Sequence, residues 1–246
     1  MKLFFSIFLH LCILATSVRA DELRSGFVYL SDVDPSILIN LKYHRSENFT
    51  GKPVRGCKRS RAVVTQEAAE ALRNVQEDLV MYGYSLVVYN AYHPKKSYDE
   101  FNNWLQSADS KEIKSSHYPN IKKTDIKSRG YIKAKYAHVR GSTVDVTIIS
   151  LKEKLRSPGK KKKRSYKGQK DIVYVHDGTL DMGTSHDIFD PLSEFDNENI
   201  PEIARDNRKM LRDNMQNHGF TANNKFWWQF TLIREPYVDS KFDFDV

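Results

Sequence analysis

His138 and Asp145 are the residues of this sequence whose types and spacing are best suited to chemistry. They bound the stretch HVRGSTVD, in which Gly141 marks a tight turn ahead of an apolar, β-branched run. Side chains alternate along a straight strand, so residues seven positions apart would face opposite ways without that turn. With the turn, an imidazole and a carboxylate can meet at one centre, and such a nitrogen–oxygen pair suits zinc. The spacing alone indicates a metal site only weakly.

Further stretches strengthen that interpretation. Together with HVRGSTVD, they resemble motifs of the D-alanyl-D-alanine dipeptidase family, and they occur in the same order along the chain. HVRGSTVD is similar to that family's H-S-R-G-S-x-x-D, and YNAYHP (89–94) to its Y-D-x-Y-R-P. LDMGTSHDIFD (180–190) resembles D-M-G-T-x-F-D, KFWWQFTL (225–232) resembles E-W-W-H-F-T-L, and the tail EPYVDSKFDF also looks familial. The resemblance covers essentially all of residues 21–246. It implies an α+β fold, with a single domain built on a central antiparallel sheet flanked by helices.

The resemblance also implies a set of site residues, of which this sequence keeps only part. The family's zinc is held by the positions of His138, Asp145 and Gln229, its general base stands at Phe226, and its charge-stabilising arginine stands at His93. A neutral glutamine is a poor substitute for a histidine ligand, and phenylalanine cannot accept a proton. Histidine is shorter than arginine and only partly charged near neutral pH. We therefore expect weak or absent zinc binding and impaired hydrolysis, as in a pseudoenzyme.

An alternative is an active zinc dipeptidase that hydrolyses D-Ala-D-Ala through a rearranged site. No glutamate of the chain is followed three positions later by a histidine, so the family's base and ligand have not moved elsewhere together. The chain does have imidazoles at two positions where the family pattern has other residues, His93 and His186. Either one could complete the metal site if its ring nitrogen lies near His138 and Asp145.

By the same resemblance, Tyr92, Asp181 and Trp227 are candidates for the wall of a substrate pocket. Plain core packing is the competing interpretation of each of them. The expected partner is a small D-amino-acid peptide or a cell-wall fragment.

Residues 1–20 have the layout of a secretory signal, with Lys2 ahead of an apolar run and a small-residue end at Ala20. We therefore expect export, to a periplasm or to the exterior, and a mature domain spanning 21–246. No later apolar run reaches membrane length, so no transmembrane segment is expected after signal removal. The mature chain keeps only Cys57, which excludes an intramolecular disulfide.

The chain is basic, with 39 Lys and Arg against 31 Asp and Glu among 246 residues. Its densest run, Lys160 to Arg164, follows a Pro-Gly pair and is predicted to be an exposed loop. A second alternative function is therefore a non-enzymatic basic binding module. No aromatic residues are interleaved with the run, so no nucleic-acid partner is expected. Asn48 begins a glycosylation sequon that matters only in a eukaryotic host.

Periodicity and capping residues predict the elements that must position these groups. The expected helices are 65–82, one beginning near Ser97, and 205–218, with 109–135 mainly loop around one short helix. The expected strands are 86–92, 144–151 and 226–232, and 37–39 is expected to be a strand or a short helical turn.

Overall fold

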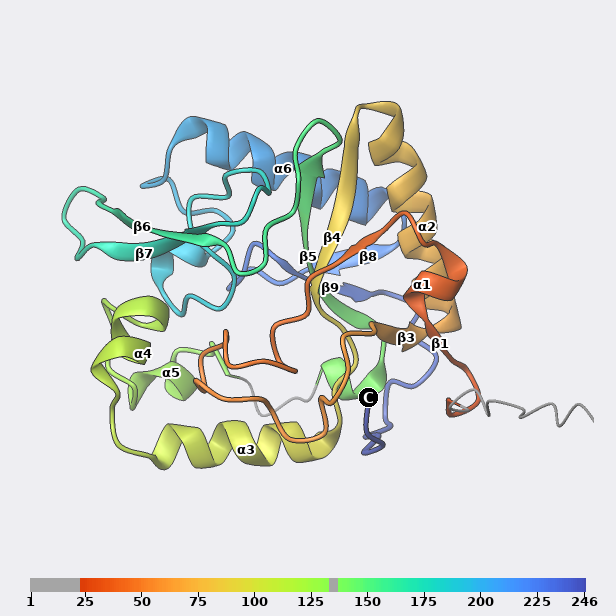
Figure 1. The fold of residues 1–246 in the computed structure, drawn as a ribbon, viewed down its shortest axis with the longest axis horizontal. Helices are drawn as coiled ribbons and strands as arrows, with labels where there is room; N and C mark the ends of the chain where they lie inside the picture. Colours follow the sequence, from red (N-terminus) through yellow and green to blue (C-terminus); the bar gives the residue numbers. More distant parts are fainter. Residues whose placement is uncertain (1–22, 133–136) are drawn as a thin grey trace, which may run out of the picture.

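The computed structural model describes residues 23–132 and 137–246, which are organised around a five-stranded sheet (Figure 1). Its strand order is β2-β4-β5-β9-β8, with bounds β2 Leu38–Ile39, β4 Tyr84–Asn90, β5 Thr143–Ser150, β9 Gln229–Leu232 and β8 Phe220–Ala222. β2 pairs with β4 in parallel, and the other neighbours are antiparallel. The α+β class is confirmed, although the sheet is mixed because of the β2 pairing.

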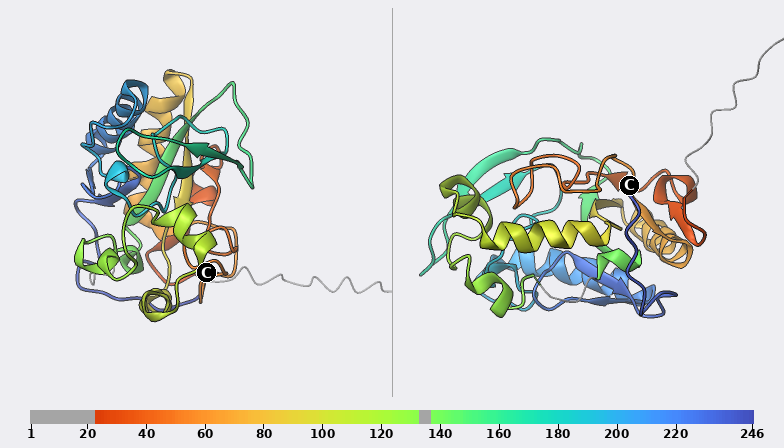
Figure 2. Two further views of the ribbon diagram at one scale, coloured as in Figure 1. Left: turned by 90° about the vertical axis from the view of Figure 1, so that its left-hand side faces the viewer. Right: turned by 90° about the horizontal axis from the view of Figure 1, so that it is seen from below.

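Two long helices, α2 (Gln66–Met81) and α6 (Glu202–Asn217), cover one face of the sheet (Figure 2). α2 matches its prediction: the Thr65 hydroxyl accepts the amide of Ala68 at the start, and Gly83 follows the end with a φ of 82°. Its apolar stripe, including Leu72 and Leu79, is fully buried.

The remaining helices and short strands complete the frame. They are β1 Phe27–Tyr29, α1 Leu30–Val33, β3 Val63–Thr65, α3 Lys95–Gln106, α4 Lys111–His117, α5 Asp125–Ser128, and the 3-10 turns η1 His138–Arg140 and η2 Pro191–Ser193. The helix predicted to start near Ser97 begins two residues earlier, and Ser97 does not cap it. Its hydroxyl donates to the carbonyl of Arg55 instead. The region predicted as loop with one short helix contains both α4 and α5.

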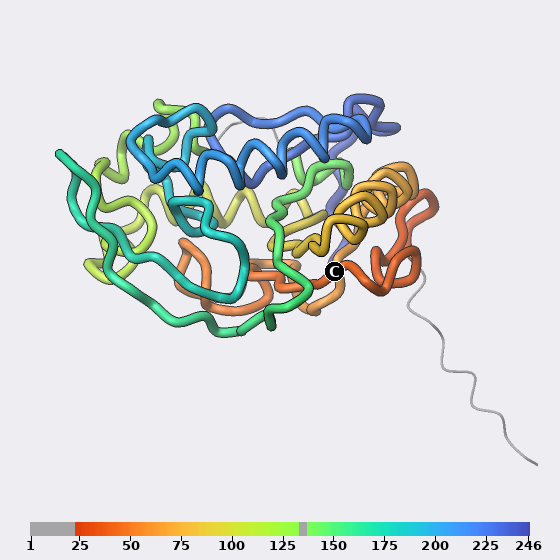
Figure 3. The backbone as a smooth tube through the Cα atoms, turned by 90° about the horizontal axis from the view of Figure 1, so that it is seen from above, coloured from red at the N-terminus to blue at the C-terminus, as the bar shows by residue number. Residues whose placement is uncertain are grey.

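The basic run forms a strand, so the prediction of a loop there is wrong. β6 (Lys160–Arg164) pairs antiparallel with β7 (Ile172–His176), and its four lysines are exposed. The apolar partner strand supplies the packing that the lysine run lacks, which is why composition did not reveal the hairpin. The hairpin lies outside the five-stranded sheet, and β7 lies beside α4 (Figure 3). A basic binding module there stays a prediction.

Residues 1–22, which include the predicted signal, lie outside the described residues. Within the described part of the chain, no helix is long and apolar enough to cross a membrane.

Candidate functional site

His138 and Asp145 converge at the middle of the sheet, as their spacing predicts. His138 lies in the 3-10 turn η1, Gly141 follows it with a φ of 81°, and Asp145 lies on β5. A Cβ at position 141 would also meet the Phe27 ring, so this turn requires glycine. Both side chains are buried, with His138 Nε2 3.3 Å from Asp145 Oδ1.

Gln229 joins this pair because β9 pairs with β5 in a register that places Gln229 opposite Asp145. Its amide nitrogen Nε2 lies 3.1 Å from His138 Nε2 and 3.3 Å from Asp145 Oδ1. The third position implied by the family resemblance is therefore next to the other two in space.

The orientation of the Gln229 amide follows from a chain of hydrogen bonds that begins at the backbone. The amide N–H of Lys225 donates to Asn223 Oδ1 at 3.0 Å, which leaves the Asn223 nitrogen to donate to Gln229 Oε1 at 2.6 Å. The Gln229 nitrogen must then face His138 and Asp145. His138 matches this arrangement, because its Nδ1 donates to the carbonyl of Ala91 at 3.0 Å and leaves Nε2 to accept.

The residues present do not fit a hydrolytic zinc ion. Such an ion needs three protein ligands that offer lone pairs, whereas the Gln229 amide presents N–H groups to the position between His138 and Asp145. Among the described residues, no group of three or more His, Cys, Asp or Glu side chains is placed to hold a metal ion. The expectation of weak or absent zinc binding stays a prediction.

Asp145 is surrounded by hydrogen-bond donors. Besides Gln229, Asn90 donates to its Oδ2 at 3.1 Å and His186 Nε2 donates to the same oxygen at 3.2 Å. Burial acts to raise the pKa of Asp145, but its hydrogen-bonding surroundings outweigh burial and hold that pKa below its usual range. The buried group is therefore a carboxylate with hydrogen-bond donors on both of its oxygens.

Of the two imidazoles considered for a rearranged site, only His186 lies within reach of Asp145. It approaches Oδ2, however, whereas His138 faces Oδ1, so the two rings contact opposite oxygens of the carboxylate. His93 stacks on His138 with ring centroids 5.0 Å apart. Burial lowers the pKa of His93 well below its usual value, which leaves a neutral ring at the position of the family's arginine.

Phe226 lies in the turn just before β9 and packs its ring on Trp228, with centroids 4.7 Å apart. Both side chains are buried and both line a cavity of about 440 Å³ beside the His138–Asp145 pair. The position of the family's general base thus contributes an apolar wall.

Asp187 is a residue of this cavity that the sequence interpretation missed. It lies in the left-handed backbone region at a φ of 61°, a costly conformation for a non-glycine residue. Tyr43 donates to its Oδ1 at 3.3 Å, while no protein group among the described residues contacts Oδ2. Burial raises the pKa of Asp187 to about 6. The final aspartate of the D-M-G-T-x-F-D pattern was the signal that could have identified it.

The three residues predicted as pocket wall do not line this cavity. Tyr92 stacks on Phe244 and donates to its backbone carbonyl, so it is a packing residue. Asp181 forms a bidentate ion pair with Arg164 and lines neither of the two described cavities. Trp227 donates to Thr184 and lines a different cavity.

Comparisons with known proteins agree with this geometry. The sequence model of the D-ala-D-ala dipeptidase family matches residues 23–160 and 164–246. A D-alanyl-D-alanine dipeptidase of Enterococcus faecium is 34% identical over 221 residues, which cover 90% of this chain and 98% of that protein. One from Streptomyces coelicolor is 33% identical over 225 residues, covering 91% of this chain and 100% of that protein. This chain therefore belongs to the D-Ala-D-Ala dipeptidase family.

Proposed function

We propose that this protein has lost D-Ala-D-Ala hydrolysis and keeps the cavity beside His138 as a binding site for a small D-amino-acid peptide or cell-wall fragment. The observation that carries the proposal is the orientation of the Gln229 amide, whose N–H groups face His138 and Asp145. An amide nitrogen has no lone pair available for a metal, and it already satisfies both of its neighbours.

The groups that hydrolysis needs besides a metal ion are also missing, which supports the same proposal. Hydrolysis of a peptide bond needs a group that takes a proton from the attacking water and a group that stabilises the oxyanion. Phe226 offers no proton acceptor, and the buried, neutral His93 offers no positive charge. Restoring one of these groups alone would leave the others missing.

Binding does not require those groups. The unpartnered Oδ2 of Asp187 supports contact with an ammonium group, such as the free amino end of a peptide. The rings of Phe226 and Trp228 support contact with a small apolar side chain. Export through residues 1–20 and action near peptidoglycan are part of this proposal.

A rearranged active site is the second candidate, and the contact of His186 with Asp145 favours it. If the Gln229 amide moved away and Asp145 rotated, His138 and His186 could face a common ion. The two candidates differ in zinc content and in turnover, so one set of proteins can distinguish them.

The test compares the wild-type protein with a variant carrying Gln229→His, Phe226→Glu and His93→Arg. Zinc per chain is measured by mass spectrometry after purification with zinc, and release of D-alanine from D-Ala-D-Ala is measured in the same samples. We expect the variant to hold about one zinc per chain and to release D-alanine at least about a hundredfold faster than wild type. Stoichiometric zinc and enzyme-like turnover in the wild type would overturn the proposal.

Binding is measured separately by calorimetric titration of the wild type with D-Ala-D-Ala, with Asp187→Asn as the matched variant. We expect binding that weakens at least about tenfold when the carboxylate becomes an amide. Equal binding by both proteins would show that the cavity does not bind the peptide through Asp187.

A further inference from the structure

A second cavity, of about 340 Å³, lies on the side of His186 away from the first one, and the two share no lining residue. Its walls come from the segment after β2, from β4, from α4 and from the β6–β7 hairpin. Lys42, Tyr89, His117, Asp177 and His186 are the polar and aromatic residues that matter for its chemistry. A cavity of this size is sufficient for a small molecule.

Lys42 is the unusual member of this wall. The residue as a whole is only 8% exposed, its Nζ is not among the fully buried atoms, and no hydrogen bond or ion pair joins that Nζ to another described residue. Its ammonium lies 5.1 Å from the centre of the Tyr89 ring, a cation–π contact that offsets only part of the cost of burial. Burial lowers the pKa of Lys42 below its usual value.

Asp177, the carboxylate with the largest electrostatic effect on Lys42, forms no ion pair with it. Asp177 Oδ2 accepts the Tyr89 hydroxyl at 2.6 Å, and Oδ1 accepts the Thr179 hydroxyl at 2.7 Å. Asp177 therefore holds the Tyr89 ring in place beneath the Lys42 ammonium. The backbone of Lys42 is also held, because its amide donates to the Tyr89 carbonyl at 3.2 Å.

A lysine whose side chain is largely buried, and whose ammonium has no protein partner, is partly desolvated and is favourable for binding an anion. The surroundings suit a single negative charge and disfavour a double one, because Glu47 and Glu112 also line the cavity. His117 adds a neutral acceptor: its Nδ1 donates to the Asp187 carbonyl at 2.9 Å, which leaves Nε2 unprotonated. A monocarboxylate that also carries an N–H or hydroxyl group matches both features.

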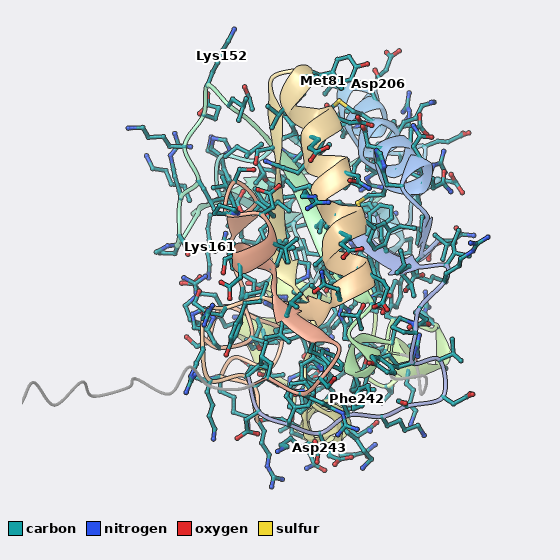
Figure 4. All side chains as sticks on the ribbon, turned by 90° about the vertical axis from the view of Figure 1, so that its right-hand side faces the viewer. Met81, Lys152, Lys161, Asp206, Phe242 and Asp243 are labelled. Atoms are coloured by element: carbon teal, nitrogen blue, oxygen red, sulfur yellow. The ribbon has the colours of Figure 1, made fainter. Side chains whose placement is uncertain are left out.

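We propose that this cavity is a second ligand site, which binds a small monocarboxylate of about amino-acid to dipeptide size through the Lys42 ammonium. The ligand's own hydrogen-bond donor contacts His117. The site shares no lining residue with the peptide-binding cavity proposed above, and the β6–β7 hairpin forms part of its wall. Lys161 of that hairpin is labelled in Figure 4.

The experiment is a titration followed by two-dimensional NMR, with N-acetyl-D-alanine as the probe and its primary amide, N-acetyl-D-alaninamide, as the matched control. The probe carries the carboxylate and an N–H but no ammonium, so it lacks the group proposed to contact Asp187. We expect saturable binding of the acid, with shifts at Tyr89, His117 and Tyr174, and at least about tenfold weaker binding of the amide.

Lys42→Met keeps the length of the side chain and removes its charge, and Lys152→Met removes an exposed charge that lines neither described cavity. We expect Lys42→Met to weaken binding of the acid at least about tenfold and to melt at the same or a higher temperature, since an unpaired buried charge is gone. Lys152→Met should bind the acid as the wild type does.

The proposal is overturned if the acid and the amide bind alike, if Lys42→Met binds the acid unchanged, or if the shifts appear only around the first cavity. Should Lys42→Met fail to fold, the comparison of acid with amide on the wild type decides the matter. Because the Asp187→Asn result and D-Ala-D-Ala binding are measured separately, failure of this proposal is distinct from failure of the proposed function.

Discussion

The charged groups of the two cavities differ in whether other protein groups hydrogen-bond to them. Around the first, the Asp145 carboxylate accepts from Asn90, Gln229 and His186, so the charge is fully surrounded by donors. In the second, the Lys42 side chain is largely buried and its ammonium has no hydrogen-bond or ion-pair partner among the described residues. The first cluster is therefore complete without a ligand, and the second is incomplete without one.

Under the proposed function, the site would have lost its chemistry without losing its frame. The Gln229 amide donates to both groups that would otherwise face a cation, so the replacement costs no unsatisfied polar atom there. The strand pairing, the Gly141 turn and the tryptophans stay compatible with the family's fold. Ligands would then bind through other residues that line the two cavities, such as Asp187 in the first and Lys42 in the second.

The largest expected effect comes from breaking the complete cluster. Asp145→Asn places an NH₂ group against donors that now point at a carboxylate, and we expect a loss of about 3–5 kcal/mol in the free energy of unfolding. Urea unfolding followed by tryptophan fluorescence measures it. Asp206→Asn, on the exposed side of α6 and labelled in Figure 4, is the control and should change stability by less than about 0.5 kcal/mol. A similarly small loss for Asp145→Asn would contradict the picture of a charge held by its donors.

A smaller effect should follow from reversing the Gln229 amide. Asn223→Asp can still accept the Lys225 amide but offers no donor to Gln229, which must turn its oxygen toward His138 and Asp145. We expect a loss of about 1–3 kcal/mol, since two acceptors then face an oxygen. Added zinc should raise the melting temperature of this variant and not that of the wild type.

Asn224→Asp adds the same charge at the edge of the same cavity and is the matched control. If it responds to zinc as Asn223→Asp does, added negative charge and not amide orientation explains the result.

The smallest effect concerns His117, which joins the two cavities by donating to Asp187 from the wall of the second. Burial lowers its pKa from 6.5 to about 4. As the pH falls from 6.5 toward 4, the unfolded chain takes up a proton that the folded one does not, so stability falls; above 6.5 this contribution to the pH dependence vanishes. We expect a decrease of about 1–2 kcal/mol across that interval, because the ring is partly solvent-exposed. Urea unfolding at several pH values should show a shallower decrease for His117→Gln, and parallel curves would refute the assignment.

Much of the frame could be predicted from the sequence, because local signals determine it. The Thr65 cap, the apolar stripe and Gly83 predict α2 within a residue or two, and β-branched runs predict β4 and β5. The hairpin containing β6 was missed because a lysine run carries no strand signal, and its pairing with β7 supplies the structure.

By itself, the sequence predicted that His138 and Asp145 meet across a glycine turn, and its resemblance to the family implied that Gln229 and Phe226 stand at the positions of a ligand and a base. The tertiary structure alone decided which end of the Gln229 amide faces them, since that depends on Asn223 and on the backbone amide of Lys225. It also decided that Asp187 lines the first cavity and that Lys42 has no partner in the second. Residue types determine which groups are available, but hydrogen-bond direction and burial depend on neighbours that come from distant parts of the chain.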